Sequence, residues 1–122
     1  MSMEIATRLS EQIGRYLDLA SAQARITAAN MANIDTPGYR ALGMDFEAEM
    51  RQAMSDAEPA TSSRIPRVRE VDGLVARPDG NDVSMDRESL NLAEAQLKFK
   101  TGVALLHVEY QKVMDAIRVT DK

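Results

Sequence analysis

Few side chains in this chain are of the types that carry catalysis or bind metals. The 122 residues include one histidine, His107, and no cysteine. A histidine base, a thiolate nucleophile or a zinc site depends on these residue types, with further polar groups beside them. His107 lies beside an apolar repeat with no ligand cluster near it, so we interpret it as a half-exposed helix residue. The sequence predicts no catalytic residue and no enzyme.

Two charged clusters are candidates for binding an ion or a partner. Asp79-Gly80-Asn81-Asp82 supplies oxygen ligands, but it lacks the twelve-residue pattern ending in Glu that binds calcium in an EF-hand. A basic cluster, offset by acidic neighbours, favours solvated loop charge, with an acidic partner surface as the alternative; it comprises Arg64, Arg67 and Arg69. The net charge of -4 argues against nucleic-acid binding. We expect no metal, cofactor, small-molecule substrate or nucleic acid.

The composition favours long helices over a thick core. Aromatic residues make up 4% of the chain and Trp is absent, whereas there are eight Met. No run of eighteen apolar residues occurs, so we expect no membrane span. The first residues lack a basic region followed by an apolar one, so we also expect no cleaved secretory signal.

The last third of the chain predicts one long helix, over residues 84–122. Its apolar residues recur at steps of four and three: Phe99, Val103, Leu106, Tyr110, Val113 and Ile117. Steps that average 3.5 residues are typical of a helix with one seam against a partner helix. A helix of this length in a chain of this size needs a partner of comparable length.

Residues 1–35 predict that partner. Their apolar stripe contains Leu9, Ile13, Tyr16 and Ala20, and Pro37-Gly38 ends the pattern. We expect a mainly α fold in which the two terminal helices pair as an antiparallel, coiled-coil-like hairpin and form one helical domain. Each helix has a glycine beside its seam, Gly14 and Gly102. Each glycine is either a tolerated surface position or a point of close approach.

The connecting segment, residues 36–83, is expected to be mostly irregular. Residues 45–54 predict a short helix capped by Asp45, and residues 55–64 a mobile loop. Asp72-Gly73 lies between two β-prone runs and predicts a hairpin over 67–77. Ser84 is expected to cap the last helix.

The last helix carries a second apolar stripe, which implies more than one neighbour. We expect this stripe to contact other subunits through Leu90, Leu97, Ala104 and Val108. The chain is thus expected to complete its core in a polymer or bundle.

The turn after the first helix resembles a known motif. Residues 29–40 read ANMANIDTPGYR, similar to the ANxANxxTPGY[KR] motif of bacterial flagellar axial proteins. On physical grounds, two asparagines one helical turn apart can bond the last carbonyl groups of a helix. The residues that match are Asn30, Asn33, Thr36, Pro37, Gly38 and Tyr39.

A second stretch narrows the resemblance. Residues 77–88 read RPDGNDVSMDRE and resemble the RPDGNxVxxxxE stretch of the FlgB family of proximal rod subunits. The residues that match are Arg77, Pro78, Asp79, Gly80, Asn81 and Glu88. The FlgC family of rod subunits shares the general plan and is the alternative. A soluble helical secretion chaperone or adaptor is the alternative from another class.

The resemblance implies a non-enzymatic structural subunit of the flagellar basal-body rod, the drive shaft that crosses the periplasm. It implies polymerisation through the terminal helices, and export by the flagellar type III apparatus without signal cleavage. The implied partners are copies of the chain, other rod proteins, the membrane ring, and the adaptor and export-gate proteins.

Overall fold

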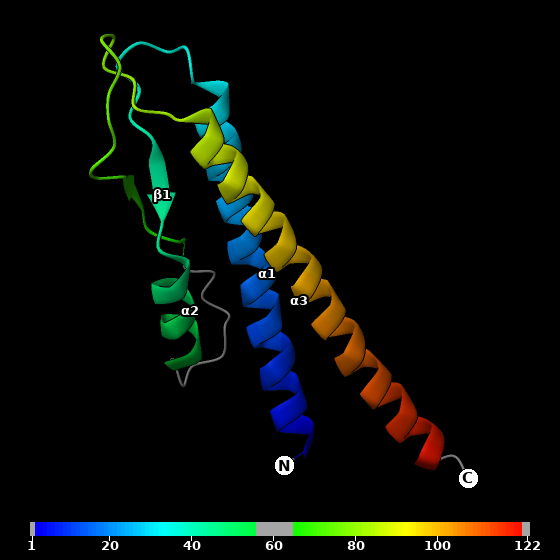
Figure 1. Ribbon diagram of the computed structural model, residues 1–122. Coiled ribbons are helices and arrows are strands. Elements are labelled where there is room, and N and C mark those ends of the chain that lie inside the picture. The colour runs from blue at the N-terminus through cyan, green and yellow to red at the C-terminus, as the bar shows by residue number, and fades with distance from the viewer. Residues whose placement is uncertain (1, 56–64, 121–122) are drawn as a thin grey trace.

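The structure is a computed structural model that describes residues 2–55 and 65–120. Two long helices lie at the chain ends, and a short helix and two short strands lie between them (Figure 1). The elements are α1 (Ser2–Ala32), β1 (Leu42–Met44), α2 (Phe46–Ser55), β2 (Val68–Glu70) and α3 (Met85–Thr120). The predicted mainly α class, with two long terminal helices, is confirmed.

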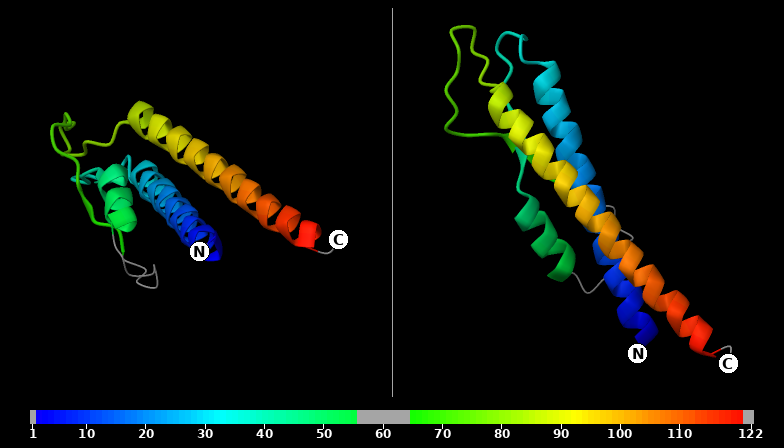
Figure 2. Two further views of the ribbon diagram at one scale, coloured as in Figure 1. Left: turned by 90° about the horizontal axis from the view of Figure 1, so that it is seen from below. Right: turned by 45° about the vertical axis from the view of Figure 1, so that its right-hand side comes forward.

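Helices α1 and α3 run antiparallel and are close together only over part of their length. They meet where α1 ends and α3 begins, and they diverge toward the N- and C-termini (Figures 1 and 2). Helix α2 and strand β1 lie beside them, against α1, and β2 pairs with the far side of β1. The buried apolar residues are few and mostly small, as the composition predicted: Ile13, Leu19, Ala20, Ala41, Val83 and Ala95.

The long helices also approach each other closely at Gly102. A Cβ atom added there would lie 2.6 Å from Cδ2 of Leu17 and 3.0 Å from Cδ1 of Tyr16. A Cβ added at Gly14 would meet nothing within 4 Å. Close approach therefore explains the glycine in α3, and tolerance explains the one in α1.

The face of α3 that packs on α1 runs through Ala95 and Gly102, which are buried. Of the residues predicted to form the seam, Ile13 and Ala20 are buried, and Tyr16 and Leu106 are half-buried. The remaining members are exposed in the single chain: Leu9, Phe99, Val103, Tyr110, Val113 and Ile117. The reason is that α3 contacts α1 through its smallest side chains and then diverges from it.

The hairpin predicted over residues 67–77 is wrong. Strand β2 pairs antiparallel with β1, with Gly43 opposite Arg69, and residues 74–76 form no strand. The Asp72-Gly73 turn is present, with φ of +81° at Gly73. The turn was predicted correctly, but the strand before it, β2, pairs with β1, which packs on α1, and not with residues 74–76.

Both predicted capping residues are confirmed. The carboxylate of Asp45 accepts from the backbone N–H of Ala48 at 3.0 Å, and the Ser84 hydroxyl accepts from that of Arg87 at 3.4 Å. Each cap satisfies an otherwise unpaired donor in the first turn of its helix. The loop predicted over 55–64 lies outside the described residues, apart from Ser55 at the end of α2.

The glycine pair gives a matched test of the helix contact. We expect Gly14→Ala to raise the free energy of unfolding by about 0.5–1 kcal/mol, because alanine favours helix and the space is open. We expect Gly102→Ala to be less stable than Gly14→Ala by about 1–3 kcal/mol, because the added methyl group overpacks the contact. Urea unfolding followed by circular dichroism measures both, and equal effects would show that the helices are not in contact at Gly102.

Candidate functional site

The chain leaves α1 through a tight turn over residues 36–39. The backbone N–H of Tyr39 donates to the carbonyl oxygen of Thr36 at 3.2 Å, and Gly38 has a φ of +76°. Proline second and glycine third are the residues that this type II geometry favours. The motif string therefore specifies the turn by its own backbone preferences.

The second motif forms a turn of a different type, with glycine in the fourth position, and it docks on the first turn. The N–H of Gly80 donates to the carbonyl of Arg77 at 2.8 Å, with φ of +84° at Gly80. Across the two turns, the N–H of Gly38 donates to the carbonyl of Asp79 at 2.9 Å. A Cβ on Gly80 would lie 3.4 Å from the Cα of Gly38, so the backbones are nearly in contact. We call the region formed by residues 30–42 and 77–88 the helix-end joint.

Asn81 joins the two motifs through its side chain. Its Nδ2 donates to the carbonyl oxygens of Asn33 and Thr36, each at 2.9 Å. Its Oδ1 accepts from the N–H of Val83 at 2.8 Å, and the residue is fully buried. One amide thus satisfies two carbonyl groups beyond the end of α1 and also shapes the segment that leads into α3.

Asn30 performs the corresponding task on β1. Its Oδ1 accepts from the N–H of Leu42 at 3.0 Å, while its Nδ2 donates to the carbonyl of the same residue at 2.8 Å. The hydroxyl of Tyr39 also donates to Oδ1, at 3.3 Å. The amide pairs with Leu42 as a neighbouring strand would, so it holds the start of β1 against α1.

The other motif residues complete the helix end. Asn33 donates through Nδ2 to the carbonyl of Ala29 at 2.8 Å and accepts from the Thr36 hydroxyl at 3.0 Å. The guanidinium of Arg77 donates to the carbonyl of Val83 at 3.0 Å and to that of Ile34. Amide and guanidinium groups thus bond carbonyl oxygens at the end of α1 and just beyond it.

Asp82 belongs to this joint, although the sequence reasoning did not assign it a role. Its Oδ1 accepts from the N–H of Ala41 at 2.6 Å, and Nε of Arg40 lies 3.2 Å from its Oδ2. The carboxylate is buried, whereas half of the Arg40 side chain is exposed. A burial signal was not visible in the sequence, because an aspartate in a run of turn residues normally faces water.

Glu88 is the buried charge of the joint on the α3 side. It is fully buried, and its Oε1 lies 3.2 Å from Nη1 of Arg87. Its Oε2 has no hydrogen-bond partner within the described part of the chain. Removing Arg87 would leave this charge buried and unpaired, which is costly.

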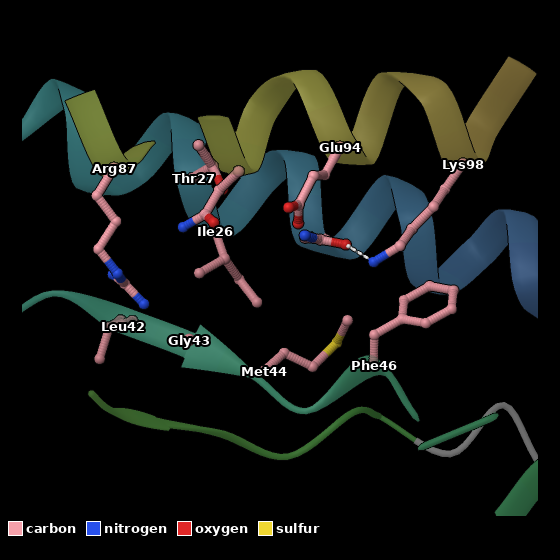
Figure 3. Close-up of a pocket in the computed structure, with 11 residues that line it drawn as sticks. Ile26, Thr27, Leu42, Gly43, Met44, Phe46, Arg87, Glu94 and Lys98 are labelled. Atoms are coloured by element: carbon pink, nitrogen blue, oxygen red, sulfur yellow. Dashed lines mark hydrogen bonds between the residues drawn. The ribbon is translucent and has the colours of Figure 1, made fainter. Parts of the chain in front are cut away.

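A pocket lies beside the joint, between the long helices and β1 (Figure 3). Lys98 donates to Oε1 of Gln23 at 3.1 Å, and its Nζ lies 4.1 Å from the centre of the Phe46 ring. That ring also packs edge-on against Tyr16, with ring centres 5.3 Å apart. These contacts fasten the start of α2 to both long helices. The described lining residues include no histidine, cysteine or serine.

The four residues predicted to contact other subunits are spread along one side of α3. Leu90, Leu97, Ala104 and Val108 are all exposed in the single chain. Within residues 2–55 and 65–120, no group of three side chains could hold a metal ion. None of the helices described there has the length and apolar character to cross a membrane.

Comparison with known proteins agrees with the motifs. A family model described as "Flagella basal body rod protein" matches residues 17–40, which span the second half of α1 and the first turn. FlgB of Salmonella typhimurium strain LT2 is 32% identical over 120 residues, covering 84% of this chain and 87% of the relative. FlgB of Cereibacter sphaeroides is 30% identical over 125 residues, covering 92% and 98%.

The chain belongs to the FlgB family of flagellar basal body rod proteins. It is therefore a structural protein of the basal-body rod, and the alternative rod family is not favoured. FlgB of Escherichia coli K12 is 28% identical over 120 residues, covering 84% of this chain and 87% of the relative. The matched residues 17–40 include the two asparagines that organise the helix-end joint, Asn30 and Asn33.

Asn81 gives the sharpest test of the joint. We expect Asn81→Asp to lower the free energy of unfolding by about 2–4 kcal/mol, because it removes two donors and faces two carbonyl oxygens with a charge. The matched control is Asn91→Asp in the pocket wall, whose side chain forms no hydrogen bond in the described structure. We expect the control to change stability by less than about 0.5 kcal/mol. Equal effects of the two substitutions in urea unfolding would contradict the assigned role of Asn81.

Proposed function

We propose that this rod protein polymerises through its terminal helices, with copies of itself and other rod proteins covering the part of α3 that the single chain leaves open. The observation that carries this proposal is the exposure of the apolar side chains of α3 beyond Gly102, on more than one side of the helix. Its large apolar residues there are Val103, Leu105, Val108, Tyr110, Val113, Met114, Ile117 and Val119, all exposed.

The physical argument rests on apolar area. Burying apolar surface stabilises a contact by about 25 cal/mol per Å², so eight exposed large side chains on one helix are a strong driving force for association. A long exposed apolar surface on a soluble subunit is typical of an interaction site. Neighbouring helices of the same polymer are the occupants that a rod would supply.

The exposed residues fall into two sets with different proposed roles. The first set belongs to the predicted helix-pairing seam, in the part of α3 beyond Gly102, and comprises Val103, Tyr110 and Ile117. We propose that assembly brings partner helices onto this part of the seam. Leu90, Leu97, Ala104 and Val108 remain the proposed contacts to other subunits. What supports both roles is exposure in the single chain together with helical spacing.

The helix-end joint is proposed to transmit torque. Its hydrogen bonds connect residues 48 and 45 positions apart in sequence, so the two long helices are tied at one end without depending on apolar packing alone. A shaft subunit must keep this geometry under load, and buried, fully bonded amides make such a connection rigid.

The cellular setting is also a proposal. We propose that the rod containing this chain crosses the periplasm, and that the chain is exported by the flagellar type III apparatus without a cleaved signal. The membrane ring and the adaptor and export-gate proteins are the proposed neighbours at the base. Membership of the FlgB family and the resemblance of both motifs support these assignments.

Leu97 tests the subunit contact. We expect Leu97→Glu to reduce the chain recovered in purified basal bodies about tenfold, because a charge would be buried at the interface. Export should change less, since two thirds of Leu97 is exposed in the single chain, where a charge would face water. Quantitative mass spectrometry of the basal-body and external fractions measures both.

Two variants control for this result. Leu97→Met keeps the apolar surface, and Gln96→Glu places the same charge one residue away. Both control variants should assemble normally. If Leu97→Glu is exported and still assembles a normal rod, the assignment of Leu97 is wrong. Recovery of the unmodified chain in the cytosol alone would instead contradict the proposed export.

The open ends of the helices should be labile until assembly. In dilute chain, we expect amide hydrogen exchange to be fast over residues 4–12 and 106–119, because few buried contacts hold them. Residues 26–34 and 81–95, at the joint, should exchange more slowly. In assembled basal bodies both terminal segments should gain protection, and a dilute chain protected along its whole length would contradict the proposal.

A further inference from the structure

The two-stranded sheet has one edge that no described residue of the chain pairs with. The N–H of Val71 donates to the carbonyl of Ala41 at 3.0 Å, which sets the alternation of the ladder. Residues 69 and 71 therefore direct their backbone groups toward β1, and Val68 and Glu70 direct theirs away from it. No other described residue hydrogen-bonds to the outward groups of Val68 and Glu70.

The opposite edge of the sheet is bonded at Leu42. The outward N–H and C=O of Leu42 are both bonded by the side-chain amide of Asn30. The fold thus bonds Leu42 on the edge of β1 that faces α1, whereas no described residue bonds the outward groups of β2. An unpaired strand edge is a template for pairing with another chain.

The surroundings of β2 are those of a contact surface. The two most exposed large apolar side chains among the described residues flank it along the chain: Ile65 is 86% exposed and Val75 is 90% exposed. Arg67 and Arg69 lie on one face of the strand, two residues apart. Arg69 forms no ion pair in the described structure, and Nε of Arg67 is 3.9 Å from Oε1 of Glu49.

A second copy of this chain is a poor occupant of the edge, because every symmetric pairing opposes like charges. Antiparallel pairing centred on Val68 would set Arg67 opposite Arg69 of the other copy. Centring on Arg69 sets arginine opposite arginine, and centring on Glu70 sets glutamate opposite glutamate. In-register parallel pairing also stacks each charge on its like, and such pairs are destabilising.

We propose that β2 is a docking edge for an extended segment of a different protein, which adds a strand through the outward groups of Val68 and Glu70. The incoming segment carries carboxylates at two alternate positions, opposite Arg67 and Arg69. Backbone bonds supply the affinity in this mode, and the alternating side chains supply the specificity. This contact goes beyond assembly through α3 and is made by a separate surface.

The test uses the full chain, labelled with ¹⁵N, and two synthetic peptides with free edges. The acidic probe is acetyl-Thr-Glu-Thr-Glu-Thr-amide, and the control replaces both glutamates by lysine. We expect saturable shifts of the Val68 and Glu70 amides with the acidic probe, and about tenfold weaker binding of the basic one. The inward amides of Arg69 and Val71 should shift less.

Two variants separate the backbone from the charges. Val68→Pro removes an outward N–H without removing a bond to β1, and should abolish binding while the remaining spectrum is unchanged. Arg67→Glu with Arg69→Glu should reverse the preference between the peptides. Both variants are first shown to keep the helicity of the parent chain.

Several outcomes would overturn the proposal. They are equal binding of the two peptides, no binding of either, shifts centred on Arg69 and Val71, or dimerisation of the chain through β2. None of these results bears on assembly through α3, which the Leu97 variants test separately. Failure of this inference is thus distinguishable from failure of the proposed function.

Discussion

The structure of this chain depends on one buried amide, which bonds the turn that follows α1. The side chain of Asn81 donates to the carbonyl oxygens of Asn33 and Thr36, which lie 48 and 45 residues earlier in the chain. Because this amide is fully buried, leaving its N–H groups unbonded would cost about 1–3 kcal/mol. This one contact therefore decides which distant segment lies at the end of α1.

The position of Asn81 in the chain converts this contact into an orientation. Val83 and Ser84 follow it directly, and α3 begins at Met85. The start of α3 is thus held at the end of α1, and two long helices joined in this way must run antiparallel. The glycine at 102 then lets the backbones approach, whereas beyond it the described side chains of α3 are mostly exposed and the helices diverge.

The helices and their caps could be predicted because their signals are local. Apolar spacing, Asp45, Ser84 and the Pro-Gly turn act over a few residues, and the structure agrees with each. The hairpin prediction was wrong because local sequence signals do not predict pairing between segments that are far apart in the chain. The composition of residues 68–71 favours a strand, but it does not say which segment that strand pairs with. Strand β2 pairs with β1, and β1 is held in place by Asn30 of α1, which bonds Leu42.

The helix-end joint was predictable in part for the same reason. The motif residues could be named, and a bond from the asparagines to helix carbonyls was expected, but Asp82 was not assigned a role because its burial comes from the docking of two turns. The predicted seam is displaced on α3, since periodicity marks the apolar faces of a helix without saying which face meets a given partner. Ala95 and Gly102 are only weakly hydrophobic, yet they form the face of α3 that packs on α1, because they are small.

The two ends of the molecule are built from opposite kinds of interaction, and this division suits a polymer subunit. Hydrogen bonds at the joint are directional and are satisfied within the chain, so that end has one geometry whether or not neighbours are present. Apolar burial is non-directional and can be completed by any surface of suitable shape. A subunit that keeps its polar geometry internal and leaves apolar helix faces open can fold its joint first and gain the rest of its stability from its neighbours. The same division predicts that substitutions at the joint act on the single chain, whereas those on the open face of α3 act on the polymer.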